Sequence, residues 1–169
     1  MRRTALALIP LLALISGPVM AQKAAPPVLF RFYRLSLDTA LKMAQATITA
    51  CRRKGVNVAV TVVDRSGHVQ VVLRDTLAMN LALRVSRDKA YTAMTFDAPT
   101  SRLADRFPGS YSVPKEPGII ISAGGLPITA AGSIIGGIGV SGSPSGATDE
   151  KCARAGLDAV RVDIEMSAQ

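Results

Sequence analysis

The chain has 169 residues, of which 49% are hydrophobic and only 4% aromatic, and its formal net charge is +8. This length suits one domain with a core of small side chains, and the basic balance favours anionic partners. The Lys and Arg residues are scattered rather than gathered beside aromatic residues, so we expect no nucleic-acid partner.

The first 21 residues have the pattern of a secretory signal peptide. Arg2 and Arg3 make a basic start, residues 5–15 form an apolar run too short to span a bilayer, and Val19 and Ala21 suit the −3 and −1 positions of a cleavage site. The alternative is an uncleaved anchor, but no stop-transfer pattern follows. We therefore expect cleavage after Ala21 and a periplasmic or secreted protein with no stable membrane insertion.

Residues 22–35 are expected to form a linker and an edge strand, ahead of a domain that covers residues 36–166. Ser36 is a typical N-cap for a helix, and Gly55 a typical stop. Between them, apolar residues recur at spacings of four and three residues, which predicts one buried helical face that includes Cys51.

Residues 56–74 predict a β-hairpin, with alternating valines in its first strand and a turn at residues 64–67. Strict alternation along the second strand would place His68 and Arg74 on the face opposite Val69, Val71 and Leu73.

A second helix is expected over residues 81–96. At 100° per residue, Lys89 falls on the same apolar arc as Ala82, Ala93 and Phe96. A lysine on that side of the helix either binds an anionic group or covers the core with its stem while its ammonium reaches water.

The remaining elements are expected to be a short helix from Thr100 or Ser101 to Phe107, three strands over residues 119–141, and a last helix capped by Thr148. The first of those strands would end before Ala123. Hairpins without a β-α-β alternation predict a single α+β domain whose antiparallel sheet is flanked by helices.

Gly137, Gly139 and Gly142 spell a G-x-G-x-x-G motif, but no helix begins at the third glycine. A dinucleotide-binding turn requires such a helix. The glycines therefore indicate that this strand approaches something closely, either a packed helix or a flat ligand.

Cys51 and Cys152 each lie on the inner face of an expected helix. If these two helices pack side by side, an oxidising compartment favours a disulfide between the cysteines over two free buried thiols.

Four blocks in order resemble the GlcG/HbpS haem-binding family, which includes the C-terminal domain of PduO-type proteins. They read "VAVTVVDRSGHVQVVLRD", "RDKAYTAMTFDAPTS", "GGLPITAAGSIIGGIGVSG" and "DEKCARAGLDAV". The resemblance implies a profilin-like fold, a homo-oligomer and, for several members, haem binding. The sequence departs from the family at residues 74–78, where Arg-Asp-Thr-Leu-Ala replaces the common Arg-Met-Asp-Gly-Ala.

Haem would need a flat apolar slot, cations for its propionates and a donor to its iron. His68 is the single histidine and the best iron ligand, although a solvated turn residue would look the same. Met43, Met79 and Met94 are weaker donors. The other candidates are two cations, a hydroxyl and five positions for close backbone contact, each with surface exposure or packing as the alternative: Arg74, Lys89, Thr92, Gly124, Gly125, Pro127, Gly137 and Gly139.

The resulting hypothesis is an exported haem-binding protein for storage, transport or redox sensing. The alternative is a small-molecule enzyme or binding protein for a carboxylic acid, in which Lys89 or Arg74 holds the substrate and Asp149 or Asp75 transfers protons. No nucleophile elbow and no zinc-type spacing of Cys and His occur, so no catalytic residue is assigned.

Overall fold

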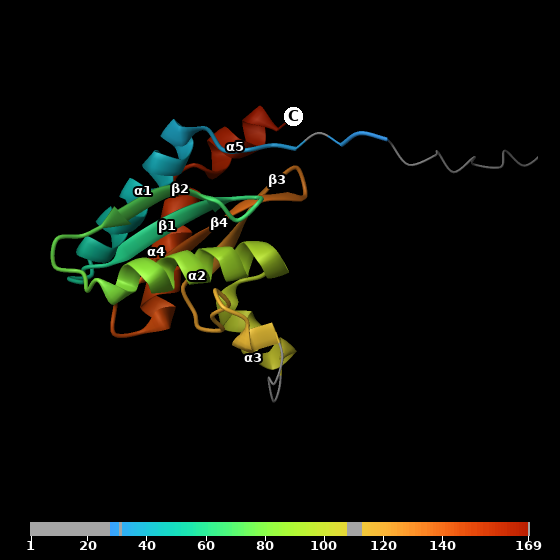
Figure 1. Ribbon diagram of the computed structural model, residues 1–169. Helices are drawn as coiled ribbons and strands as arrows, with labels where there is room; N and C mark the ends of the chain where they lie inside the picture. The colour runs from blue at the N-terminus through green and yellow to red at the C-terminus, as the bar shows by residue number, and fades with distance from the viewer. Residues whose placement is uncertain (1–27, 31, 108–112, 169) are drawn as a thin grey trace, which may run out of the picture. The chain divides into compact units, whose positions relative to one another are not determined.

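The computed structural model describes residues 28–30, 32–107 and 113–168 (Figure 1). The expected signal peptide and cleavage site lie outside the described residues. The chain divides into two units, Met1–Phe30 and Arg31–Gln169, and every helix and strand reported below belongs to the second.

The second unit is built on a four-stranded antiparallel sheet with the order β2-β1-β4-β3. Its strands are β1 (Ala59–Asp64), β2 (Val69–Arg74), β3 (Gly125–Ala130) and β4 (Ser133–Ser141). Two hairpins, β1–β2 and β3–β4, are thus joined through β1 and β4, and β2 and β3 form the edges. This arrangement confirms the predicted α+β class with an antiparallel sheet flanked by helices.

Helices cover both faces of the sheet. Helices α1 (Leu37–Arg52) and α4 (Gly146–Asp158) pack together on one face, and α2 (Leu81–Phe96) crosses the other (Figure 1). Shorter helices follow α2 and α4, namely α3 (Leu103–Arg106) and α5 (Arg161–Ser167), with 3₁₀ turns at Thr100–Arg102 and Val113–Lys115. No helix in the described ranges is long and apolar enough to cross a membrane.

Strand β1 is buried along its whole length because both of its faces are covered. Val60 and Val62 join the apolar core under α1 and α4, while the Thr61 hydroxyl lies 2.8 Å from that of Ser86 on α2. The alternating valines therefore identify one covered face correctly, and α2 supplies the cover on the other face.

The predicted disulfide is confirmed. Cys51 on α1 and Cys152 on α4 are bonded, with their Cα atoms 5.5 Å apart and both side chains fully buried. The Ser36 cap of α1 is also present, since Ser36 Oγ accepts a hydrogen bond from the Thr39 amide at 3.2 Å.

Two predicted strands are absent, and one predicted helix start is wrong. Residues 119–122 form no strand, because this segment lies against α2, where the Ile120 amide donates to Thr92 Oγ1 at 2.9 Å. The described residues between 28 and 35 form no edge strand, and the Leu35 carbonyl accepts from the Gln70 side chain instead of from a backbone ladder. Helix α4 starts two residues before Thr148, after Ser145.

Candidate functional site

The turn between β1 and β2 carries the single histidine of the chain. Asp64 organises this turn, since its Oδ1 accepts from the backbone amides of Ser66 at 2.8 Å and His68 at 3.0 Å. Gly67 has φ +81°, and a Cβ at this position would lie 2.7 Å from the Tyr91 ring of α2. The turn is therefore fixed by its own carboxylate and by close packing on α2.

A β-bulge follows the turn and changes the predicted faces of β2. Val62 pairs with Val71, but the next residue, Val63, pairs with Val69, so Gln70 is the extra residue. The simple alternation that placed His68 on the same face as Arg74 is therefore wrong, because a bulge shifts the phase of a strand by one residue.

His68 presents its imidazole to solvent, with 80% of the side chain exposed. Its Nδ1 faces Asp64 Oδ1 at 3.8 Å. Because Nε2 lies across the ring from Nδ1, it points away from Asp64. Many metal-ligating histidines donate a hydrogen bond from their other nitrogen to a carboxylate, and Asp64 lies on that side of His68, although 3.8 Å is longer than a hydrogen bond.

Two arginines and an aromatic ring lie around the same turn. Arg34 lies 3.3 Å from Asp64 Oδ2, and the Arg65 guanidinium lies over the Phe32 ring at 4.3 Å from its centroid. Phe32, Arg34, Arg65 and Ser66 line a hollow of about 300 Å³. Sequence reasoning missed Phe32 and Arg34 because they precede α1 and meet the turn only through the fold.

Arg74 does not converge with His68. The two residues stand at opposite ends of β2, six positions apart, which corresponds to roughly 20 Å of extended strand. The Arg74 guanidinium donates to the Ala78 carbonyl at 2.6 Å. Arg34, which pairs with the carboxylate that His68 faces, and Arg65 of the turn itself are the cations at the His68 end of β2.

Lys89 lies on the buried side of α2, as its helical phase predicts, but its ammonium has internal partners. Its Nζ is 3.0 Å from Asp149 Oδ2 and 3.0 Å from the Val140 carbonyl. A ligand role for Lys89 would require this ion pair to open. Thr92 is likewise engaged, since its hydroxyl donates to the Asp88 carbonyl and accepts from Ile120.

Three glycines of β3 and β4 lie under α2. A Cβ added at Gly139 would be 2.0 Å from the Ser86 carbonyl, at Gly137 it would be 2.3 Å from that of Ala90, and at Gly125 it would be 2.4 Å from that of Lys89. Of the two alternatives left by the sequence, a packed helix is therefore what approaches this strand. Gly124 has φ +126° and borders the Lys89 ammonium.

Pro127 lies elsewhere, on the edge strand β3, in a hollow of about 250 Å³ that Arg154 and Arg161 also line. Of the weaker donors, Met43 is fully buried and Met79 is exposed, while the Met94 side chain borders Gly67 beside the turn. The structure thus divides the predicted site residues among the turn, the α2 packing surface and the β3 edge.

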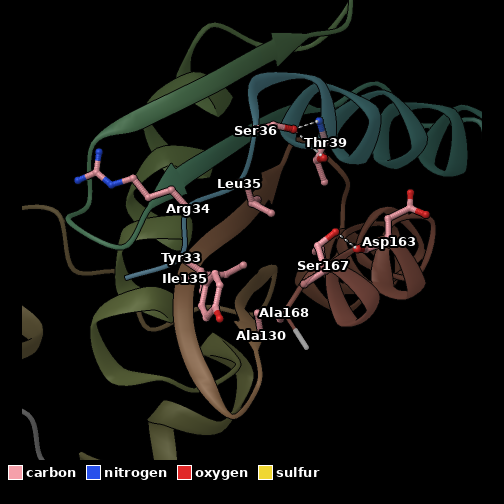
Figure 2. A pocket seen from close by; sticks show the side chains of 11 residues that line it. Tyr33, Arg34, Leu35, Ser36, Thr39, Ala130, Ile135, Asp163, Ser167 and Ala168 are labelled. Carbon is pink, nitrogen blue, oxygen red and sulfur yellow. Dashed lines mark hydrogen bonds between the residues drawn. The ribbon is translucent and has the colours of Figure 1, made fainter. Parts of the chain in front are cut away.

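Another hollow, of about 240 Å³, opens between the segment before α1, the β3–β4 hairpin and α5 (Figure 2). Leu35 and Ile135 contribute apolar walls, and Figure 2 shows Arg34 pointing away from it. Its carboxylate, Asp163, is paired with Lys42 at 2.8 Å. This hollow suits a small, largely apolar molecule better than an anion.

The sequence and fold of the chain are similar to those of known proteins. Residues 35–158 match the family model described as haem degrading protein HbpS-like. A crystal structure of a double mutant of HbpS from Streptomyces reticuli is 41% identical with a TM-score of 0.74, and the match covers 83% of this chain and 97% of that one.

Two further relatives extend the comparison. An uncharacterized 15.0 kDa protein from the dhaT-dhaS intergenic region of Citrobacter freundii is 34% identical, over 64% of this chain and 80% of that protein. The crystal structure of a PduOC:heme complex is 26% identical with a TM-score of 0.70, and the match covers 75% of this chain and 95% of that one. Because the family model matches residues 35–158 and the solved HbpS structure shares the fold at 41% identity, the chain belongs to the HbpS-like family.

Proposed function

We propose that this protein binds haem at the β1–β2 turn, with His68 Nε2 as the ligand to iron. The observation that carries the proposal is the geometry of His68, an exposed imidazole whose Nδ1 faces the same Asp64 carboxylate that pairs with Arg34. The family description and the haem complex of a relative support the choice of haem over other flat anions.

The residues at the turn fit the chemistry of haem. Its ring is flat and apolar, and Phe32 and Val69 are large apolar side chains that are exposed near the turn. Its propionates are anionic, and the Arg34 and Arg65 side chains, which line the same hollow, carry positive charge. The positive net charge of the chain adds a general attraction for a dianionic ligand.

Each residue of the turn has a distinct task in this proposal. Asp64 orients the His68 ring through the carboxylate that faces Nδ1. Arg34 and Arg65 hold the propionates, which orients the ring relative to the turn. The bound group supplies an iron centre whose exchangeable ligands and redox state depend on this surrounding protein.

The proposed role is storage, transport or redox sensing by an exported protein. Export rests on the signal-like pattern of residues 1–21. The disulfide between Cys51 and Cys152 agrees with an oxidising compartment, where such bonds persist. We also propose that the protein forms a homo-oligomer, since the apolar side chains of Val72 on β2 and Leu81 on α2 are exposed.

Haemin titration tests the proposal. The full chain is expected to shift the Soret band saturably, His68→Ala to change the spectrum of the bound form, and Arg34→Gln with Arg65→Gln to weaken binding. Arg53→Gln, an exposed arginine at the end of α1, is the matched control and should bind like the unmodified chain. A shift equal to that of an unrelated basic protein would overturn haem binding, and an unchanged His68→Ala spectrum would overturn the ligand assignment.

A further inference from the structure

The first two turns of α4 border a hollow that is separate from the histidine turn. It has a volume of about 280 Å³. The hollow lies beside α4, which packs on β3 and β4, whereas the histidine turn belongs to β2 at the other edge of the sheet. Its lining combines small side chains with charged ones: Ser101, Ala123, Ala147, Glu150, Lys151 and Arg154.

Glu150 has an unused acceptor at this hollow. Its Oε2 is buried and accepts no hydrogen bond from any residue that the structure describes. Arg154 stands four residues later on the same helix, a spacing that commonly forms an ion pair, yet none joins the two side chains. A buried carboxylate oxygen without a donor is costly, so this oxygen is suited to a donor from outside the chain.

Lys151 and Arg154 supply positive charge to the same hollow. Both side chains are exposed, and neither forms a hydrogen bond or ion pair with the described part of the chain. A guanidinium binds a carboxylate through two parallel hydrogen bonds, and an ammonium beside it adds charge. The two cations therefore suit one carboxylate group.

The walls limit the size of a ligand. Ala123 and Ala147 contribute only methyl groups, and the neighbouring Gly146 is so close that an added Cβ would lie 2.7 Å from the Ala123 carbonyl. The space between the two cations and the Glu150 acceptor is thus small and mildly apolar.

We propose that this hollow binds a small carboxylate that carries a hydroxyl or amino group next to its carboxyl carbon. The carboxylate contacts Arg154 and Lys151, and the hydroxyl or amino group donates to Glu150 Oε2. The site is independent of the proposed haem site, because it shares no residue with the β1–β2 turn.

Three matched probes separate the contributions: lactate has both groups, propanoate lacks the hydroxyl, and lactamide lacks the charge. Titration of the full chain by NMR chemical shifts or calorimetry should show saturable lactate binding. Propanoate should bind about tenfold more weakly, since a hydrogen bond to a charged group is worth at least that factor. Lactamide should show no saturable binding.

Variants assign the roles. Glu150→Ala should bind lactate and propanoate equally, Arg154→Gln should abolish binding of both, and Arg84→Gln on α2 is the matched control that should change neither. If Glu150→Ala does not fold, Glu150→Gln should narrow the preference for lactate, because a neutral amide oxygen is a weaker acceptor.

Absence of saturable lactate binding, equal binding of lactate and propanoate, or an Arg84→Gln effect as large as that of Arg154→Gln would overturn the proposal. Haemin titration of the same variants distinguishes the two sites. Glu150→Ala and Arg154→Gln should retain the Soret shift of the unmodified chain, so that either function can fail without the other.

Discussion

Lys89 and Asp149 form a buried ion pair that connects the two faces of the sheet. Lys89 Nζ and Asp149 Oδ2 are 3.0 Å apart, and each side chain is only 4% exposed. Lys89 belongs to α2 and Asp149 to the first turn of α4, which lie on opposite faces, and the pair meets at the end of β4 beside the Val140 carbonyl. Asp149 also accepts from the Ser143 amide at 3.1 Å.

Replacing only the lysine should therefore strongly reduce the free energy of unfolding. Lys89→Met leaves the Asp149 charge buried without its cation, and loss of one partner of a buried pair typically costs about 3–5 kcal/mol. Urea unfolding followed by circular dichroism measures this loss. The double variant Lys89→Met with Asp149→Asn should recover part of it, because no buried charge remains. A single variant as stable as the unmodified chain would contradict the role of the pair.

The second prediction concerns the pH dependence of stability. Arg52 donates to Asp75 through Nε at 2.7 Å and through a terminal nitrogen at 2.8 Å. This hydrogen bonding lowers the pKa of Asp75 below its ordinary value of 3.8, with a further contribution from the Thr76 amide and opposition from burial. A carboxylate with a lowered pKa stabilises the fold above its unfolded pKa, and that stabilisation disappears as pH falls through the folded pKa.

Arg52→Gln should thus reduce the free energy of unfolding at neutral pH, and the difference from the unmodified chain should close as pH falls below 3.8. Urea unfolding across this pH range measures the difference, and NMR titration should show a raised pKa for Asp75. Arg53→Gln, the neighbouring residue without a carboxylate partner in the described chain, is the control. A stability difference that stays constant with pH would exclude the ion pair as its cause.

The third prediction tests the contact between β4 and α2. A Cβ at Gly139 would lie 2.0 Å from the Ser86 carbonyl and 2.5 Å from the Ala90 nitrogen, both backbone atoms of α2. Gly139→Ala should therefore push the helix from the sheet and cost about 3 kcal/mol or more. Thermal unfolding is the measurement.

Gly132→Ala is a suitable comparison, because Gly132 has φ +73° and no atom within 4 Å of an added Cβ. It should cost only the conformational penalty, about 1 kcal/mol. Equal effects at the two positions would mean that helix packing does not limit residue 139.

The fourth prediction concerns the Cys51–Cys152 disulfide, which joins positions 101 residues apart. Closing a loop of that length restricts the unfolded chain and stabilises the fold by up to about 4–5 kcal/mol. Reductant should lower the midpoint of urea unfolding of the unmodified chain and leave the Cys51→Ala, Cys152→Ala double variant unchanged. An unfolding midpoint that does not change with reductant in either protein would contradict a stabilising disulfide.

Local pattern in the sequence was enough to determine the main elements of the fold. The spacing of apolar residues identified α1 and α2, alternation identified the β1–β2 hairpin, and the inner-face positions of Cys51 and Cys152 predicted their bond. These inferences succeeded because periodicity reports which side of one element is buried. The same reasoning misplaced a strand at residues 119–122, since a short apolar run can be buried without joining a ladder.

The tertiary structure alone decided which charges and rings meet. Asp149 as the partner of Lys89, and Arg34 and Phe32 as neighbours of the His68 turn, come from contacts between residues far apart in the chain. The sequence also did not predict the bulge at Gln70, because the bulge depends on the register of β2 against β1. Side-chain pairing across elements is set by how whole helices and strands pack, and no periodicity within a single element contains that information.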